Sequence, residues 1–351
     1  MKKPTIYALI SLFFILSCTP NEQQDSQRLP IELATRQTLE TQTEKPDSLA
    51  NNLTDPQKDT TEQTNTNQQE EPTEDVLALK PQNGRYRFNW LKDGYSADDM
   101  LVNRVPPPQR YERTRVAPAS FGDWLRNLPL KKGNPNVMLY NGSPKGNQSA
   151  HAAVFNVDVG NQDLQQCADA VMRLRSEYLY QANLFNQIQY NFTNGFTANY
   201  AKWRNGYRPV TKGNKTTWAK KPKTKGKSKP ITAYDDFKLY LTDVFRYAGS
   251  LSLSKEMKPI DIADMHIGDV FIKGGTPGHA IIVVDMAQNP QTGEKLFLLA
   301  QSYMPAQDIQ LLNNPNNNGL SPWYSTNFGE TLRTPEWTFG RNDLKRFWCV
   351  R

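Results

Sequence analysis

Histidine and cysteine are the side chains best suited to proton transfer and nucleophilic attack near neutral pH. Both are scarce in this chain, whose 351 residues include three histidines and three cysteines. His279 follows the glycine-rich turn GGTPG and begins the apolar run HAIIVVDMA, so we expect it at the mouth of a strand. A histidine in such a place can act as general base for a thiol within hydrogen-bond reach. The function of His279 therefore depends on whether a cysteine thiol lies within hydrogen-bond reach of its imidazole.

Cys167 is the candidate nucleophile. It lies in QDLQQCADAVMRLRSEYLY, residues 162–180, where apolar residues recur at helical spacing and where Asn161 would provide the N-cap. On that helix the cysteine would stand more than one turn beyond the start, inside an apolar stripe, whereas an activated thiol benefits from a helix N-terminus. The pattern favours a structural cysteine, but a Cys167–His279 pair stays open because catalytic pairs are defined by geometry. The stripe consists of Leu164, Cys167, Val171, Leu174 and Tyr178.

The other histidines and cysteines predict neither a metal site nor a cofactor. The sequence contains no Cys-x-x-Cys pair and no His/Cys cluster at the spacing of metal ligands. His151, at the start of an expected strand, is interpreted as a structural residue. Cys167 and Cys349 could form a disulfide in an oxidising compartment, but the sequence does not supply the distance between them.

The elements that position these residues predict an α+β fold. We expect a helix packed on a mostly antiparallel sheet, extended by an N-terminal half that contains the Cys167 helix, in one globular domain over residues 81–351. The sheet is formed by strands that begin at Val270, His279 and Lys295, and a further helix is expected over residues 235–248.

Residues 234–303 resemble the core of the NlpC-type cell-wall cysteine peptidases, which have a papain-like fold. The resemblance rests on the segments VFRYAG, SLS, IGDVFI and GHAIIVVD, in that order. In that family a cysteine near a helix start attacks a peptide carbonyl, the histidine of the Gly-His strand is its base, and a polar residue on the next strand orients the imidazole. The resemblance implies His279 as the base and Gln301 as the orienting residue. It places Phe237 at the position of the nucleophile, and a phenyl ring cannot attack a carbonyl.

We therefore expect a domain that binds cell-wall peptide or glycan of the peptidoglycan type without cleaving it. The first alternative is a cysteine peptidase or amidase of the cell wall, with Cys167, His279 and Gln301 as catalytic residues. The second is a structural or partner-binding lipoprotein in which the apolar strands form only a buried sheet. The expected ligand-binding residues are His279, Gln301, Tyr303, Trp203 and Trp218.

The N-terminus predicts export and a lipid anchor. Two lysines precede an apolar run, residues 6–16, that is too short to span a bilayer and is typical of a signal peptide. The run ends in ILSC, which resembles a bacterial lipobox with Cys18 as the lipidated residue. Residues 1–17 are then the signal peptide, and the polar residues 18–80 predict a disordered tether. We expect a lipid-anchored protein of the bacterial cell envelope, at the outer membrane.

Residues 83–351 also resemble an uncharacterised family of bacterial lipoproteins that is catalogued as a domain of unknown function. The segments LQQCADAVMRLR, GGTPGHAIIVVD and LLAQSYMPAQ carry this resemblance. It implies no activity.

Positive charge is concentrated in one segment of a chain whose net charge is +7. Between Lys202 and Lys229 there are eleven Lys or Arg and no acidic residue, interrupted by aromatic residues that include Trp203 and Trp218. This composition predicts a flexible cationic loop that contacts anionic envelope polymers, with the tryptophans as stacking platforms. The alternative is a solvated insertion. Nucleic acid is a poor candidate partner for an exported lipoprotein.

Overall fold

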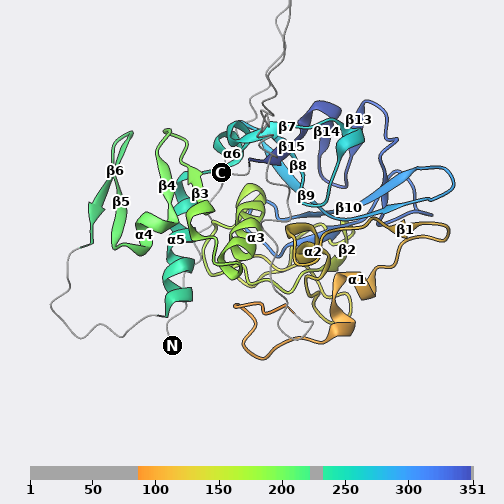
Figure 1. The fold of residues 1–351 in the computed structure, drawn as a ribbon, viewed down its shortest axis with the longest axis horizontal. Coiled ribbons are helices and arrows are strands. Elements are labelled where there is room, and N and C mark those ends of the chain that lie inside the picture. Colours follow the sequence, from red (N-terminus) through yellow and green to blue (C-terminus); the bar gives the residue numbers. More distant parts are fainter. Residues whose placement is uncertain (1–85, 222–231, 349–351) are drawn as a thin grey trace, which may run out of the picture. The chain divides into compact units, whose positions relative to one another are not determined.

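The computed structural model describes residues 86–221 and 232–348, all within one compact unit (Figure 1). Their centre is a nine-stranded sheet in which every pairing is antiparallel. Its main path runs β2 (His151–Val154), β11 (Gln310–Leu312), β10 (Lys295–Gln301), β9 (His279–Gln288), β8 (Val270–Lys273), β15 (Leu344–Phe347) and β7 (Met257–Pro259). Two short strands complete it: β1 (Glu112–Arg113) pairs with β9, and β12 (Tyr324–Ser325) pairs with β10. The prediction of an α+β fold with a mostly antiparallel sheet is confirmed.

Helices cover the middle of this sheet. α2 (Phe121–Arg126) and α3 (Cys167–Gln181) pack against β9, and α6 (Ser250–Glu256) packs against β8. The remaining helices are α1 (Leu101–Arg104), α4 (Tyr200–Arg204), α5 (Ala233–Tyr247) and the 3-10 turns η2 (Ala97–Asp99), η3 (Phe185–Gln187), η4 (Ile262–Asp264) and η5 (Arg341–Asp343). Three two-stranded sheets pair β3 (Gln189–Asn191) with β4 (Thr197–Asn199), β5 (Tyr207–Lys212) with β6 (Lys215–Lys220), and β13 (Thr331–Arg333) with β14 (Thr338–Gly340).

The three predicted central strands are present as neighbours, with β9 between β8 and β10. β9 is buried from His279 to Ala287 because protein covers both faces of the strand, which explains its continuous apolar run. The N-terminal half of the domain shares the same sheet through β2.

The start of the Cys167 helix differs from the sequence prediction. α3 begins at Cys167, and Asp169 Oδ2 accepts a hydrogen bond of 3.1 Å from the backbone N–H of Gln166. Tertiary contacts hold the preceding segment in a turn: Ser302 Oγ donates to the Gln165 carbonyl at 3.0 Å, and Asp163 Oδ1 accepts from the Ala306 N–H at 2.6 Å. The helix start expected near residue 162, with Asn161 as N-cap, is therefore wrong.

The predicted flexible loop over residues 202–229 is also wrong where the structure describes it. Residues 202–204 end α4, and β5 and β6 form a regular hairpin with Lys212 paired to Lys215 at its tip. The prediction failed because it was made from composition, while the Tyr, Val, Thr and Trp residues of β5 and β6 are good strand formers. The last four cations of the segment lie outside the described residues, in 222–231.

No helix in the described part of the chain is long and apolar enough to cross a membrane. The predicted signal peptide, the lipidated Cys18, the tether and Cys349 with its disulfide all lie outside the described residues.

Candidate functional site

His279 and Gln301 lie side by side on neighbouring strands. His279 is the first residue of β9 and Gln301 is the last of β10, and both are buried, with 1% and 2% of their surface exposed. The imidazole Nε2 and the Gln301 Oε1 are 2.9 Å apart. The structure thus brings together the two residues that the family resemblance assigned as base and orienting residue.

This pair continues into a buried charged pair. Gln301 Nε2 donates to Glu336 Oε2 at 2.7 Å, and Lys145 Nζ contacts the same carboxylate oxygen at 2.5 Å. Only 7% of the Lys145 side chain and 13% of the Glu336 side chain are exposed. Sequence reasoning missed these two residues, because they are 191 positions apart and neither belongs to a motif.

Aromatic rings surround the imidazole. The ring centroids of Tyr303, Trp337 and Phe339 lie 4.8, 5.2 and 5.9 Å from that of His279. Burial lowers the pKa of His279 to about 4, although the hydrogen bond to Gln301 and the charge of Glu336 act in the opposite direction. The imidazole is therefore neutral at pH 7.

Cys167 lies at the N-terminus of α3 and is partly exposed. The backbone N–H of Ala280, the residue after His279, is close enough to the thiol to act on its pKa. Burial raises the pKa of the Cys167 thiol to about 11; the N–H groups of Ala280, Ala168 and Cys167 itself act against this shift. Among the described residues no hydrogen bond joins the sulfur directly to the imidazole. At pH 7 the thiol on α3 and the imidazole on β9 are both neutral.

A family described as "Domain of unknown function (4846)" matches residues 101–346. The chain belongs to this DUF4846 family. The match spans Lys145, Cys167, His279, Gln301 and Glu336, so the whole constellation lies inside the DUF4846 domain. No curated protein and no solved structure matches the chain.

Phe237 of the DUF4846 domain lies on α5, away from the start of α3. Its ring stacks on Tyr180 with a centroid distance of 4.4 Å, near the C-terminal end of α3. Cys167 is at the other end of the same helix, ~20 Å away at 1.5 Å per residue. α3 is a helix that packs on the strand of His279, whereas the resemblance placed the nucleophile's position on the helix that contains Phe237.

The two tryptophans predicted to bind ligand lie on α4 and β6, in a part of the domain that Figure 1 places away from the start of β9. Trp203 is buried, with 3% of its surface exposed; its Nε1–H donates to Asp236 at 2.9 Å and Arg208 covers its ring at 3.7 Å. Its ring is therefore part of the core and is not free to stack on a sugar, which corrects the prediction. Trp218 is half-buried and packs on Phe196 at 5.2 Å.

The turn before His279 is packed tightly against α6. A Cβ at Gly278 would lie 2.4 Å from the Ser250 hydroxyl and 2.4 Å from the Gly275 carbonyl oxygen, and one at Gly274 would lie 2.3 Å from Ser254 Oγ. Only glycine fits at these two positions, so the GGTPG turn fixes where β9 and its first side chain begin.

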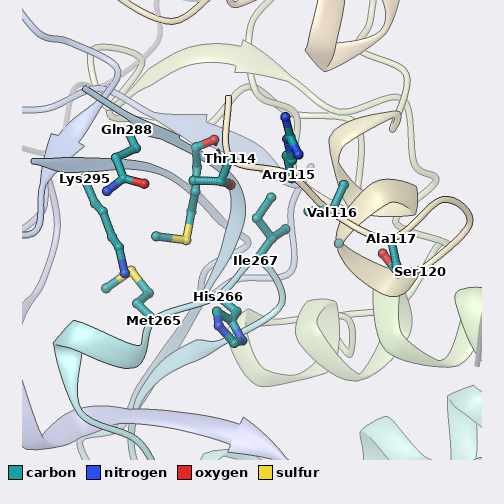
Figure 2. Close-up of a pocket in the computed structure, with 12 residues that line it drawn as sticks. Thr114, Arg115, Val116, Ala117, Ser120, Met265, His266, Ile267, Gln288 and Lys295 are labelled. Atoms are coloured by element: carbon teal, nitrogen blue, oxygen red, sulfur yellow. Dashed lines mark hydrogen bonds between the residues drawn. The ribbon is translucent and has the colours of Figure 1, made fainter. Parts of the chain in front are cut away.

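A cavity of about 350 Å³ lies elsewhere in the DUF4846 domain (Figure 2). Its lining includes Arg115, His266, Lys295 and Gln288. Gln288 ends β9, nine residues beyond His279, which is ~30 Å along a strand. The cavity is therefore distinct from the His279 constellation. The described residues also contain no group of three or more His, Cys, Asp or Glu side chains placed to hold a metal ion.

Proposed function

We propose that this domain is a papain-like, thiol-dependent hydrolase of peptide or amide bonds. In this proposal Cys167 is the nucleophile, His279 is the general base and Gln301 orients the imidazole. The observation that carries it is the position of the thiol: Cys167 is the first residue of α3, which packs on β9, and the N–H of Ala280, the residue that follows His279, is close enough to act on the pKa of the thiol. The argument for a structural cysteine depended on a helix start near residue 162, and the observed start removes it.

The surroundings of the sulfur suit a nucleophile. The positive end of the α3 dipole and the N–H groups of Cys167, Ala168 and Ala280 stabilise a thiolate as it forms. The same kind of donor stabilises the oxyanion of a tetrahedral intermediate, and the N–H of Cys167 belongs to the first helical turn, where the helix itself offers no acceptor. The thiol needs a base because burial holds its pKa at about 11; His279 supplies one.

The chemistry then follows in two acyl-transfer steps. Cys167 Sγ attacks the substrate carbonyl carbon while His279 takes the thiol proton, and the imidazolium returns that proton to the departing amine as the C–N bond breaks. A water molecule, deprotonated by His279, attacks the thioester and releases the acid. Gln301 accepts the Nε2–H throughout and keeps the imidazole in place.

The NlpC resemblance adds support to this assignment. The sequence order Cys167, His279, Gln301 is the order of that family, and the spatial arrangement is the one that its mechanism needs: a thiol at a helix start, packed against a strand that begins with histidine and a neighbouring strand that ends with an amide.

The proposed substrate is the peptide portion of peptidoglycan. The sequence predicts export and a lipid anchor, and peptidoglycan is the amide-rich polymer of the bacterial envelope. Tyr303 and Trp337, both partly exposed beside His279, offer ring surfaces to a bound peptide. The test is incubation of the exported protein with purified muropeptides and detection of new amines. New amines are the expected result; muropeptide binding without amine release would indicate a binding domain, and the absence of both would indicate a structural sheet.

The pH dependence of turnover follows from the lowered pKa of His279. A general base works in its neutral form, so activity falls only when the pH approaches the folded-state value of about 4. The groups that face the imidazole are Gln301, Tyr303, Glu336 and Lys145, and burial dominates their effects. We expect kcat/KM to keep most of its value at pH ~5.5 and its acid limb to lie well below the ordinary histidine pKa of ~6.5. An acid limb near ~6.5 would contradict this prediction.

The proposed lipid anchor is testable on its own. Cys18→Ala removes the thiol that carries the lipid, so the variant is expected in the soluble fraction of a bacterial host, whereas the unaltered protein sediments with membranes. Fractionation followed by immunoblotting measures the partition. Membrane partition that does not change in Cys18→Ala would rule out lipidation at this residue.

We also propose that the β5–β6 hairpin contacts anionic envelope polymer. Three of its region's cations, Lys202, Arg204 and Arg208, lie over aromatic rings. The other four described cations are exposed and face solvent: Lys212, Lys215, Lys220 and Lys221.

Replacing these four lysines by glutamine is expected to weaken binding to purified anionic cell-wall polymer by at least about tenfold at low salt, because it removes the local positive potential. Co-sedimentation at increasing salt measures the effect, which should shrink as screening grows. A control variant replaces four exposed cations elsewhere by glutamine and so has the same net charge as the hairpin variant: Arg87, Lys92, Lys132 and Lys255. Equal binding by the two variants would show that the hairpin is only a solvated insertion.

A further inference from the structure

Glu336 touches neither the thiol nor the imidazole, yet it is connected to His279 through one side chain. Its Oε2 accepts from Gln301 Nε2 at 2.7 Å, and Gln301 Oε1 lies 2.9 Å from His279 Nε2. A carboxylate can only accept hydrogen bonds, so the NH₂ end of Gln301 must face Glu336. The carbonyl end of the amide then faces the imidazole.

The orientation of that amide decides which nitrogen of His279 carries the proton. Gln301 Oε1 is an acceptor, so His279 Nε2 must be the protonated nitrogen and Nδ1 keeps its lone pair. Only a ring nitrogen with a free lone pair can take a proton from a thiol. If the amide turned over, its NH₂ would face Nε2, the proton would move to Nδ1, and the base would be lost.

Lys145 stabilises the negative charge of the Glu336 carboxylate. Its ammonium contacts Glu336 Oε2 at 2.5 Å, and Asn147 Nδ2 donates to Glu336 Oε1 at 3.3 Å. Both members of the Lys145–Glu336 pair are largely buried, so each neutralises a charge that would otherwise be costly in that place. An ionised Glu336 is the acceptor that holds the NH₂ end of Gln301.

We propose that Glu336, held by Lys145, is a positioning residue that fixes the amide orientation of Gln301 and thereby the Nε2–H tautomer of His279. For its effect on turnover this inference rests on the proposed function. Its effect on the tautomer does not, because the hydrogen-bond chain exists whether or not the protein cleaves a substrate.

The experiment compares the intact domain with Glu336→Gln and with the double variant Gln301→Glu, Glu336→Gln. In Glu336→Gln, the new amide at position 336 can either accept a hydrogen bond from Gln301 or donate one to it. Both orientations of the Gln301 amide therefore become possible. The double variant restores a unique pattern: the carboxylate at position 301 accepts from His279 on one side and from the amide at position 336 on the other. The double variant also keeps the total charge of the starting chain.

Long-range ¹⁵N–¹H NMR of the imidazole reads the tautomer directly, with His279 assigned by the loss of its signals in His279→Ala. We expect the Nε2–H tautomer in the starting protein, a mixture in Glu336→Gln and recovery in the double variant. With a muropeptide substrate, kcat should fall at least about tenfold in Glu336→Gln with little change in KM.

An unchanged tautomer or an unchanged kcat in Glu336→Gln, or a tautomer mixture that persists in the double variant, would overturn the inference. If the starting protein has no turnover, the proposed function fails and the tautomer spectra alone decide this inference. Thermal melts establish that each variant is folded. Should Glu336→Gln not fold, Lys145→Met tests the same chain by removing the counter-ion of Glu336; a pure Nε2–H tautomer in that variant would equally count against the inference.

Discussion

Replacing Cys167 by serine is expected to reduce peptide or amide hydrolysis by about 10⁴-fold or more. Serine has nearly the same size as cysteine, so α3 and its contact with β9 should persist. Its hydroxyl, however, is a far weaker acid and a weaker nucleophile than a thiol, so His279 activates it much less. The remaining rate measures what the backbone donors and substrate binding contribute without covalent chemistry.

Steady-state assays of amine release from muropeptides measure this change, with circular dichroism as the check that the variant is folded. Cys349→Ser is the matched control, since it removes the other cysteine of the domain and is expected to keep its turnover. Turnover that survives in Cys167→Ser would show that another group is the nucleophile. Equal losses in the two variants would instead indicate that the cysteines act through a disulfide.

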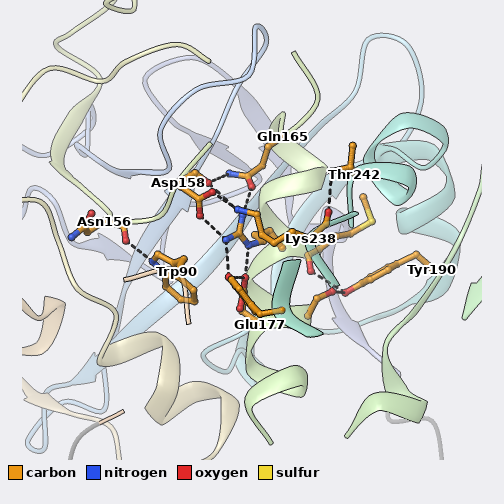
Figure 3. A network of polar contacts seen from close by, with 12 residues as sticks. Trp90, Asn156, Asp158, Gln165, Glu177, Tyr190, Lys238 and Thr242 are labelled. Carbon is orange, nitrogen blue, oxygen red and sulfur yellow. Dashed lines mark hydrogen bonds and ion pairs between the residues drawn. The ribbon is translucent and has the colours of Figure 1, made fainter. Parts of the chain in front are cut away.

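The second large effect is expected at Arg173, on the same helix as Cys167. Its guanidinium is buried, with 2% of the residue exposed, and donates to Glu177 Oε1 at 2.7 Å, to Asp158 Oδ1 at 2.8 Å and to Gln165 Oε1 at 2.9 Å (Figure 3). Burial works against the charge of this guanidinium, but the carboxylates of Glu177 and Asp158 outweigh it and raise the pKa of Arg173. These contacts tie the segment that leads into Cys167 to the second turn of α3.

Arg173→Met is expected to lower the free energy of unfolding by about 3–5 kcal/mol. The methionine fills much of the space, but the Glu177 carboxylate, with 1% of the residue exposed, is left buried without its counter-ion. Urea denaturation of the folded domain measures the change. Gln165 and Asp158, in the segment that leads into Cys167, also lose a hydrogen-bond donor. The variant should therefore lose activity at urea concentrations below those that unfold it.

Arg246→Met is the control for this prediction. Arg246 forms an i,i+3 pair with Asp243 on α5, and 44% of its side chain is exposed, so solvent screens the pair. Its replacement should change the unfolding free energy by no more than about 0.5 kcal/mol. If Arg173→Met costs as little as the control, the buried network is not what holds the start of α3.

The part of the site that lies on the sheet could be predicted from the sequence because local signals define it. The apolar runs of β8, β9 and β10, the glycine turn before His279 and the hairpin turn after β9 are short-range features, and together they place Gln301 beside His279. The start of α3 could not be predicted in the same way. Asn161 has the chemistry of an N-cap, but contacts from Ser302 and Ala306, about 140 residues away, hold the segment in a turn.

The remaining misassignments have related causes. Phe237 matched the family spacing because the nucleophile was sought close to the strand, whereas the intervening hairpins and α5 separate Cys167 from β9 in the sequence but not in space. No motif marks Glu336 and Lys145. Their roles depend on tertiary contacts, in which Glu336, just before β14, meets both Gln301 and Lys145, which precedes β2. Trp203 was selected as an aromatic residue within a basic segment, and it is buried.

The central claim is that the Cys167 thiol reacts with the help of His279, and alkylation of the folded protein with a thiol-directed electrophile tests it most directly. Peptide mapping by mass spectrometry gives the rate of modification at Cys167 in the starting protein and in His279→Ala, at pH 7. Because the thiol pKa is about 11, little thiolate exists without a base. The account predicts selective modification of Cys167 that slows at least about tenfold in His279→Ala. Equal rates in the two proteins, or no modification of Cys167 in the folded state, would contradict it.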